Sequence, residues 1–210
     1  PAMQEVRYWY AAPEARAKWD AENRAAEAVL GRPEYGTKKT PLQVTHGDGA
    51  LGVRGEGFEV LFSNPAGGPV SLRTSGCEWL WRAPRPAYWR APTENDLGNG
   101  FASGSAVWAA ADAWQECSRF QILTADKDSV SVCYTYTAPV LPGLHTDVTY
   151  TVSASGWLTV TAQYHGGAGR PDLPLFGLRF ATPEPLETVR WLGLSGETYP
   201  DRKRGGRFGW

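Results

Sequence analysis

The sequence lacks the features that mark several large classes of protein. Its three cysteines, Cys77, Cys117 and Cys133, are odd in number and widely spaced, which argues against a disulfide framework or a zinc site and indicates a reduced, cytoplasmic protein. The first residues contain no apolar signal-peptide core, and no apolar run reaches about 18 residues, which excludes a membrane-spanning helix. The 21 basic and 22 acidic residues almost cancel, so nucleic acid is not expected as a partner.

Sequence motifs of common catalytic centres are missing as well. There is no G-x-S-x-G elbow, no P-loop and no G-x-G-x-x-G after a strand. None of the histidines, His46, His145 and His165, has a second histidine at metal-ligand spacing. Glycoside hydrolysis needs two carboxylates that flank the scissile bond, whereas neighbours such as Glu94 and Asp96 usually pin a turn instead. The residues alone therefore assign no catalytic side chain and no metal ligand.

Tryptophan is abundant by comparison. The chain has 10 tryptophans in 210 residues, and most lie in or beside strand-like segments. An indole ring can stack on the apolar face of a sugar, but tryptophans more often fill cores and interfaces. Composition leaves both interpretations open, and the frequent arginine, alanine and glycine indicate a bacterial source with a GC-rich genome.

A strand pattern begins after the first 40 residues. Short alternating runs, such as 58–63 and 129–138, are separated by turns that contain glycine or proline. They predict an all-β fold, a large antiparallel β-sandwich over residues 41–210, with further strands at 78–81, 173–182 and 187–194. One short helix is expected near 103–115. Because the chain stops where the last strands would lack partners, we expect the sandwich to be truncated at its C-terminus.

Residues 1–40 have a different composition. The segment 13–30 is rich in alanine and in charged residues that favour helices, and Gly31 and Pro33 follow it as stop signals. This pattern predicts a short N-terminal helical appendage and a linker, which could be the tail of a preceding domain.

Several long motifs resemble a known family. WRAPTENDLG (89–98) and WLGLSGETYPDR (191–202), together with LPLFGLRF (173–180) and GDGALGVRGEGFEVLFS (47–63), resemble the C-terminal β-sandwich of family 2 β-galactosidases. The resemblance is closest to the small chain of heterodimeric, lactobacillus-type enzymes, and it runs in order through most of the sequence. It implies a galactose mutarotase-like supersandwich. The implied function is that of a non-catalytic domain or small subunit, which completes and shapes the active site for hydrolysis of terminal β-D-galactosides such as lactose.

The same resemblance implies where the chemistry takes place. In the family, the catalytic glutamates and the magnesium and sodium sites lie in a (β/α)8 barrel, which does not fit in 210 residues. We therefore expect no catalytic residue and no metal in this chain, and no activity from it alone. The implied partner is the barrel domain or large subunit of an oligomeric enzyme, with the galactoside at the shared site. Whether the native protein is one chain or two stays open.

The run WRAPTENDLGNG (89–100) is predicted to be a loop, because it is too irregular for a helix and too polar for a buried strand. In the family, the segment after this motif lies near the active-site mouth and can move, and glycines favour such motion. The resemblance thus implies a substrate-proximal loop made of Gly98, Asn99, Gly100, Phe101, Ala102 and Ser103. Structural roles are expected at a strand exit and in two turns for Arg90, Pro92, Asn95, Asp96, Glu197, Tyr199, Asp201 and Arg202.

Two other functions stay open at this point. A stand-alone carbohydrate-binding or aldose-epimerase-like domain would share the superfold, but His145 or His165 would then have to act with a glutamate. A purely structural or interaction domain would bind no sugar.

Overall fold

The computed structural model describes residues 40–167 and 169–187, the backbone of 193–195 and 207–209, and the single residues Ala17 and Ala21. The chain divides into two compact units, one of Gly36–Pro185 and one of Pro1–Tyr35 with Leu186–Trp210. In the second unit, strand β12 (Gly193–Ser195) pairs with β13 (Arg207–Gly209) in antiparallel fashion.

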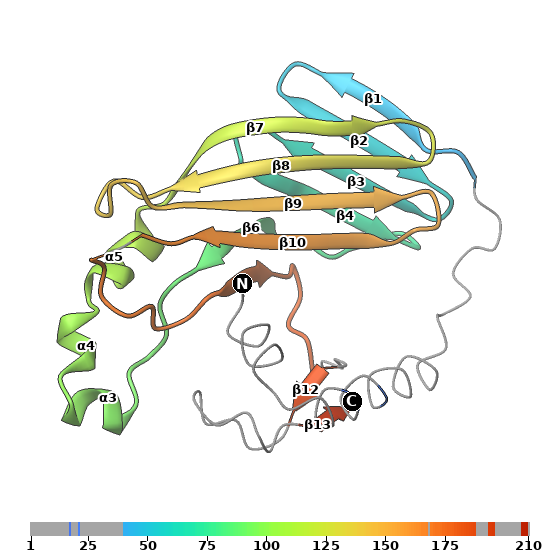
Figure 1. Ribbon diagram of the computed structural model, residues 1–210. Coiled ribbons are helices and arrows are strands. Elements are labelled where there is room, and N and C mark those ends of the chain that lie inside the picture. The colour runs from blue at the N-terminus through green and yellow to red at the C-terminus, as the bar shows by residue number, and fades with distance from the viewer. Residues whose placement is uncertain are drawn as a thin grey trace. The chain divides into compact units, whose positions relative to one another are not determined.

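Two antiparallel sheets form most of the larger unit (Figure 1). The first sheet has the strand order β1 (Gln43–Gly47), β2 (Ala50–Gly55), β3 (Phe58–Ser63), β4 (Gly68–Thr74) and β5 (Cys77–Glu78). The second sheet has the order β10 (Leu158–His165), β9 (His145–Ser153), β8 (Ser129–Thr137) and β7 (Glu116–Ala125). Strands that follow each other in the chain are neighbours in each sheet, as antiparallel strands joined by short turns can be.

One hydrophobic core lies between these two sheets. Every second side chain of β8 and of β9 is buried, because alternate residues of a strand point to the same face. The register places Val132 opposite Tyr150 on that face, and Phe62 of the first sheet packs on Tyr150 with ring centroids 6.0 Å apart. The predicted mostly-β, antiparallel architecture is therefore confirmed for the described residues.

A third sheet has only two strands, β6 (Arg82–Ala87) and β11 (Gly177–Ala181). The sequence did not predict β6, because its prolines, Pro84 and Pro86, cannot donate to a ladder and argue against a strand. It predicted strands at 78–81 and 173–182 instead, and both predictions are wrong in extent, since only Glu78 and Gly177–Ala181 are in strands there.

Side chains from elsewhere stabilise β6. The amide nitrogen Nε2 of Gln115 donates to the carbonyl of Pro86 at 2.8 Å. The hydroxyl of Tyr136 donates to the carbonyl of Gly67 and lies 3.3 Å from the carbonyl of Pro84. Backbone acceptors that face away from β11 thereby obtain partners, as buried carbonyls require.

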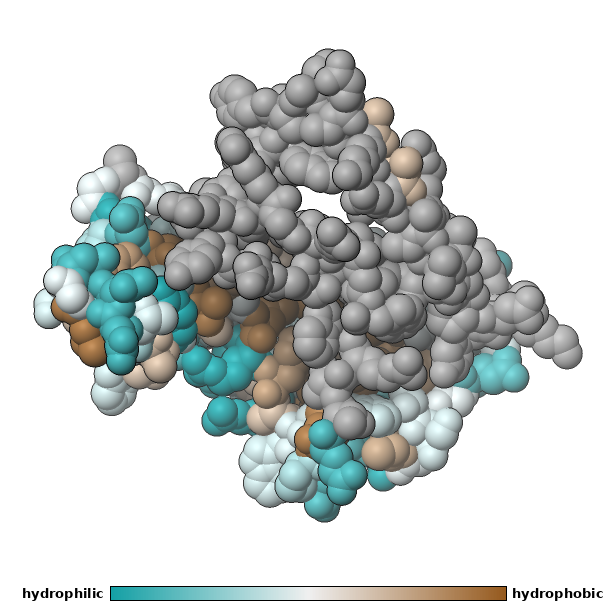
Figure 2. Space-filling view, turned by 90° about the horizontal axis from the view of Figure 1, so that it is seen from below, coloured by the Kyte–Doolittle hydropathy of each residue, from teal (hydrophilic) through white to brown (hydrophobic). Residues whose placement is uncertain are grey.

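Three short helices lie in mid-chain at one end of the sheets, namely α3 (Glu94–Gly98), α4 (Phe101–Gly104) and α5 (Val107–Ala113) (Figure 1). Helix α5 confirms the helix expected near 103–115. Seen from below, this end shows mostly hydrophilic residues with small hydrophobic patches (Figure 2). Within the described ranges no helix combines the length and apolar character that crossing a membrane demands.

The helical appendage predicted for residues 1–40 lies outside the described residues, apart from Ala17 and Ala21, which are both helical. The helices whose full bounds the structure gives, α3 to α5, lie in the middle of the chain.

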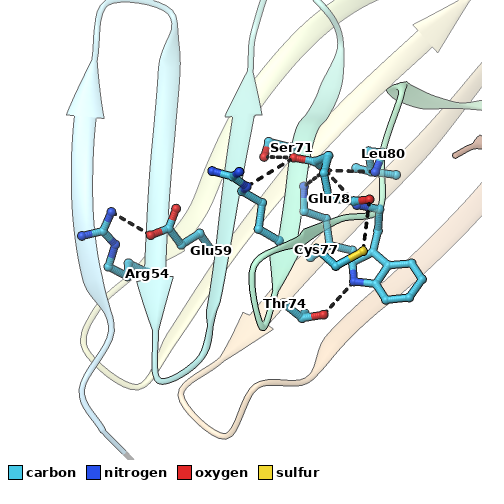
Figure 3. A network of polar contacts seen from close by, with 10 residues as sticks. Arg54, Glu59, Ser71, Thr74, Cys77, Glu78 and Leu80 are labelled. Atoms are coloured by element: carbon cyan, nitrogen blue, oxygen red, sulfur yellow. Dashed lines mark hydrogen bonds and ion pairs between the residues drawn. The ribbon is translucent and has the colours of Figure 1, made fainter. Parts of the chain in front are cut away.

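The carboxylate of Glu78 stabilises the edge of the first sheet (Figure 3). Oε1 of Glu78 accepts hydrogen bonds from the backbone amides of Leu72, Trp79 and Leu80. Oε2 accepts one from the Ser71 hydroxyl at 2.5 Å. Burial on its own raises the pKa of Glu78, but the hydrogen bonds from Ser71 and the three amides together outweigh it and lower that pKa.

Replacing Glu78 with alanine is expected to lower the free energy of unfolding by about 1–3 kcal/mol, because several donors lose their acceptor. Glu59→Ala is the matched control, since Glu59 pairs with Arg54 at the exposed surface, and the loss in this variant should stay below about 1 kcal/mol. Denaturant titrations of both variants measure the difference, and equal losses would contradict the anchoring role.

The effect of Glu78 also depends on pH in a defined direction. A carboxyl whose folded pKa is lowered stabilises the fold above its unfolded pKa of about 4.3 and loses that contribution as pH falls through the folded pKa. The difference between the parent chain and Glu78→Ala should therefore be largest near neutral pH and shrink in acid.

Candidate functional site

Tyr88 is buried directly after β6, where the chain enters the helical segment. Its hydroxyl donates to Oγ1 of Thr146 on β9 at 2.8 Å, and its backbone amide donates to Oδ1 of Asp112 on α5 at 2.8 Å. Burial raises the pKa of Tyr88 to about 12 even though the hydrogen bond with Thr146 opposes it, so the hydroxyl stays neutral. The strand exit is thus fixed to both the second sheet and the helices.

Arg90 and Asp96 form a two-pronged ion pair across the start of α3. The distance from Nη1 to Oδ2 is 2.5 Å, and that from Nη2 to Oδ1 is 3.3 Å. The hydrogen bond from Arg90, followed by the one from the Thr93 amide, holds the pKa of Asp96 well below its usual range. Asp96 is therefore a charged anchor and is a poor candidate for a proton donor.

Helix α3 begins with a capping box. The Thr93 hydroxyl accepts from the amide of Asp96 at 3.3 Å, and Oδ2 of Asp96 accepts from the amide of Thr93 at 2.7 Å. The prediction of a loop is wrong for Glu94–Gly98, because this reciprocal cap stabilises a helix in a polar segment. The T-x-x-D spacing from Thr93 to Asp96 is the signal in the sequence that could have predicted it.

The turn into α4 depends on two residues of the predicted substrate-proximal loop. Gly100 has a φ of +76°, a left-handed conformation that favours glycine. Asn99 Oδ1 accepts a hydrogen bond from the amide of Phe101 at 2.9 Å and so satisfies a donor at the start of α4. Helix α4 runs through Phe101–Gly104, so the loop prediction is wrong there too, while a location near the substrate stays a prediction.

The remaining predicted motif residues divide into two groups. Pro92 is exposed just before Thr93, and the carbonyl of Asn95 within α3 accepts from the amide of Asn99 at 3.1 Å. The other motif residues lie outside the described residues: Glu197, Tyr199, Asp201 and Arg202.

Three side chains of this end bind one irregular stretch of backbone at 171–174, which we call the carbonyl segment. The bonds join Arg90 Nε to Pro174 O at 3.3 Å, Ser105 Oγ to Asp172 O at 3.1 Å, and Trp108 Nε1 to Pro171 O at 3.1 Å. Because this stretch belongs to no sheet, its carbonyls are available as acceptors. The helical segment is thereby fixed at its base to a part of the chain more than 60 residues away in sequence.

Trp108 links the buried and accessible parts of this end. It is buried, and its ring lies 5.9 Å from that of Tyr88 and 6.0 Å from that of Tyr164, centroid to centroid. Tyr164 in turn contacts Phe176, an exposed residue, at 5.9 Å. This tryptophan fills a core, which is the more common of the two roles that composition left open.

His145 and His165 stack with ring centroids 4.3 Å apart. Nε2 of His165 lies 2.9 Å from Oδ2 of Asp147. The pairing follows from the β9–β10 register, which spacing in the sequence does not reveal. The carboxylate partner is an aspartate, so the histidine and glutamate that an epimerase-like function requires are not brought together in the described ranges. No cluster of three or more His, Cys, Asp or Glu in those ranges could hold a metal ion.

Comparison of the sequence with known proteins gives one matching family and several relatives with similar descriptions. The family described as beta galactosidase small chain matches residues 54–210. A beta-galactosidase small subunit of Latilactobacillus sakei is 43% identical over 187 residues, which cover 80% of this chain and 59% of the relative. Beta-galactosidases of Clostridium acetobutylicum and Lactobacillus delbrueckii subsp. bulgaricus are 35% and 37% identical, over 81% and 88% of this chain. The matches cover 19% and 18% of these two relatives, so the chain spans less than two thirds of each protein named here.

Substituting Asp96 with asparagine should loosen the start of α3, because the neutral amide cannot replace the ion pair with Arg90. We expect faster hydrogen exchange at the amides of α3, which mass spectrometry measures. Asp126→Asn is the matched control. The pKa of Asp126 is likewise lowered, but by the backbone amides of Asp128 and Ser129, with no arginine hydrogen bond. Unchanged exchange at α3 in Asp96→Asn would contradict the anchoring role.

Alanine at Gly100 should destabilise the fold, whereas alanine at Gly98 should not. At Gly100 the left-handed φ disfavours a side chain, and a cost of about 1–2 kcal/mol is expected. At Gly98, within α3, an added Cβ meets nothing within 4 Å, so alanine should be neutral or stabilise by up to about 1 kcal/mol. Thermal unfolding of both variants tests this, and the same sign for both would refute the assignment.

Proposed function

The chain belongs to the beta-galactosidase small-chain family, and from this premise we propose that it completes and shapes the active site of a β-galactosidase without supplying the catalytic groups. The proposed reaction of the whole enzyme is the hydrolysis of terminal β-D-galactosides such as lactose. The observation that carries the proposal is the family match over residues 54–210, which includes the whole helical segment and the carbonyl segment.

The geometry of the helical segment supports a positioning role. Its base is held by the Arg90–Asp96 pair and by the bonds to the carbonyl segment. Its glycines, Gly98, Gly100 and Gly104, have nothing within 4 Å of an added Cβ, so the tip is open. A fixed base with an open tip suits a wall that adjusts to a substrate.

The carboxylates of this segment support the same division of labour. Asp96 is paired with Arg90, and Asp112 accepts from Arg179 at 2.9 Å and from the Tyr88 amide. A general acid needs a carboxyl that is protonated near the working pH, and the hydrogen bond from Arg90 opposes this by holding the pKa of Asp96 well below its usual range. We assign the acid, the nucleophile and the magnesium and sodium sites to the barrel domain or large subunit, in an oligomeric, cytoplasmic enzyme.

The fold proposal follows the same family. The two antiparallel sheets with a shared core are compatible with part of a galactose mutarotase-like supersandwich over residues 41–210. Residues 1–40 would then form a helical segment and linker ahead of it.

The proposed function can be tested with a chimera. This chain replaces the matching region of the Latilactobacillus sakei small subunit, which is co-expressed with its large subunit, and lactose hydrolysis is assayed. We expect no hydrolysis by the 210-residue chain alone, and activity when the chimera and the large subunit are combined.

Two variants of the chimera sharpen this test. Arg90→Met should lower kcat/KM by about tenfold or more, because the helical segment at the shared site is then no longer fixed by the Arg90–Asp96 pair. Arg54→Met removes an exposed arginine whose ion pair lies on the first sheet, and it should have no effect. A folded chimera that binds the large subunit but restores no hydrolysis would count against the proposal.

A further inference from the structure

The larger unit contains a cavity of about 670 Å³ that the proposed galactosidase role does not use. Its wall has small apolar side chains and six larger polar or aromatic residues. These six are Trp81, Arg82, Arg85, Asp112, Gln115 and Arg179. The volume falls in the range of about 300–1,000 Å³ that is typical of small-molecule sites.

Gln115 shapes the inner wall of this cavity. Its side chain is only 7% exposed, and Nε2 donates to the carbonyls of Pro86 at 2.8 Å and Asp112 at 2.9 Å. Two carbonyl acceptors settle which end of the amide is nitrogen, so the other end is an oxygen. This oxygen, Oε1, is buried and has no hydrogen-bond partner in the described part of the chain. Because this oxygen has less than 1 Å² of accessible surface, Gln115 shapes the wall of the cavity and does not contact a ligand.

The cavity also carries positive charge that its own carboxylate does not balance. Arg85 and Arg179 stand opposite each other in the β6–β11 register, where like charges repel. Asp112 pairs with Arg179, whereas Arg85 reaches only the carbonyl of Gln115, at 3.4 Å. Over 40–167 and 169–187, neither Arg82 nor Arg85 has a carboxylate partner. Guanidinium groups in this position bind oxyanions well.

Trp81 adds a flat apolar surface beside these charges. Its side chain is 71% exposed, yet its backbone is fixed, because its amide donates to the carbonyl of Ala181 at 2.8 Å. An exposed indole on a rigid backbone can stack on the apolar face of a sugar ring.

We propose that this cavity binds a sugar acid of monosaccharide size. The carboxylate of the ligand pairs with Arg85 and Arg82, and the ring lies against Trp81. An acidic polypeptide could also satisfy the arginines, but a cavity of this volume suits one compact molecule, and an indole beside the arginines suits a ring that carries a carboxylate.

Isothermal titration calorimetry on the full chain tests the proposal with galacturonate as the probe. Galactose lacks the charge, and acetate lacks both ring and hydroxyls. We expect saturable galacturonate binding in the millimolar range or tighter, at least about tenfold stronger than that of either control. This assay needs no barrel partner, so its result is independent of the proposed galactosidase role.

Variants identify the site. Arg85→Met and Trp81→Ala should each weaken galacturonate binding by about fivefold or more. The matched controls Arg54→Met and Trp157→Ala alter an exposed arginine and an exposed tryptophan that do not line the cavity, and they should leave binding unchanged.

Three results would overturn the proposal. One is the absence of saturable heat with galacturonate, and another is equal affinity for galactose. The third is binding of an oligoglutamate peptide that galacturonate does not displace, which would assign the cavity to a polypeptide.

Discussion

The arrangement of the helical end depends on the burial of Tyr88. One residue joins β9 through its hydroxyl, α5 through its amide, and Trp108 through its ring. Its hydroxyl stays neutral because burial raises its pKa to about 12, so the hydrogen bond with Thr146 persists across the physiological pH range. Trp108 in turn donates a hydrogen bond to the carbonyl segment and so fixes the position of that segment. The position of α3 and α4 thus follows from contacts made inside the protein by the residue that directly precedes the motif.

Asp112 extends this constraint to the cavity. One oxygen of its carboxylate holds the strand exit at Tyr88, and the other pairs with Arg179 on the cavity wall. Its backbone carbonyl also orients the Gln115 amide. If the cavity binds an anion, that charge acts on the same arginine and carboxylate that fix the helical segment. The two proposed roles of this chain therefore share a residue, although each is tested by its own experiment.

Sequence patterns predicted the parts of the fold in which burial repeats every second residue, such as β8 and β9. They failed at β6, whose prolines cannot donate to a ladder and so argue against a strand, and at α3, where a capping box outweighs a polar composition. The family motif drew attention to this segment, whose location near the substrate stays a prediction. It could not reveal the carbonyl segment or the histidine stack, because these contacts depend on how distant strands align, and no local pattern encodes that alignment.

Arg85 and Arg90 show why residue type alone does not separate a structural charge from one that is available to a ligand. Both arginines lie near the exit of β6, five positions apart in the sequence. Arg90 forms two hydrogen bonds with the carboxylate of Asp96. Its charge lowers the pKa of Asp96 and holds the start of helix α3. Arg85 meets a carbonyl and faces another arginine. The placement of the few carboxylates at this end, more than that of the arginines, therefore decides which positive charge can act on another molecule.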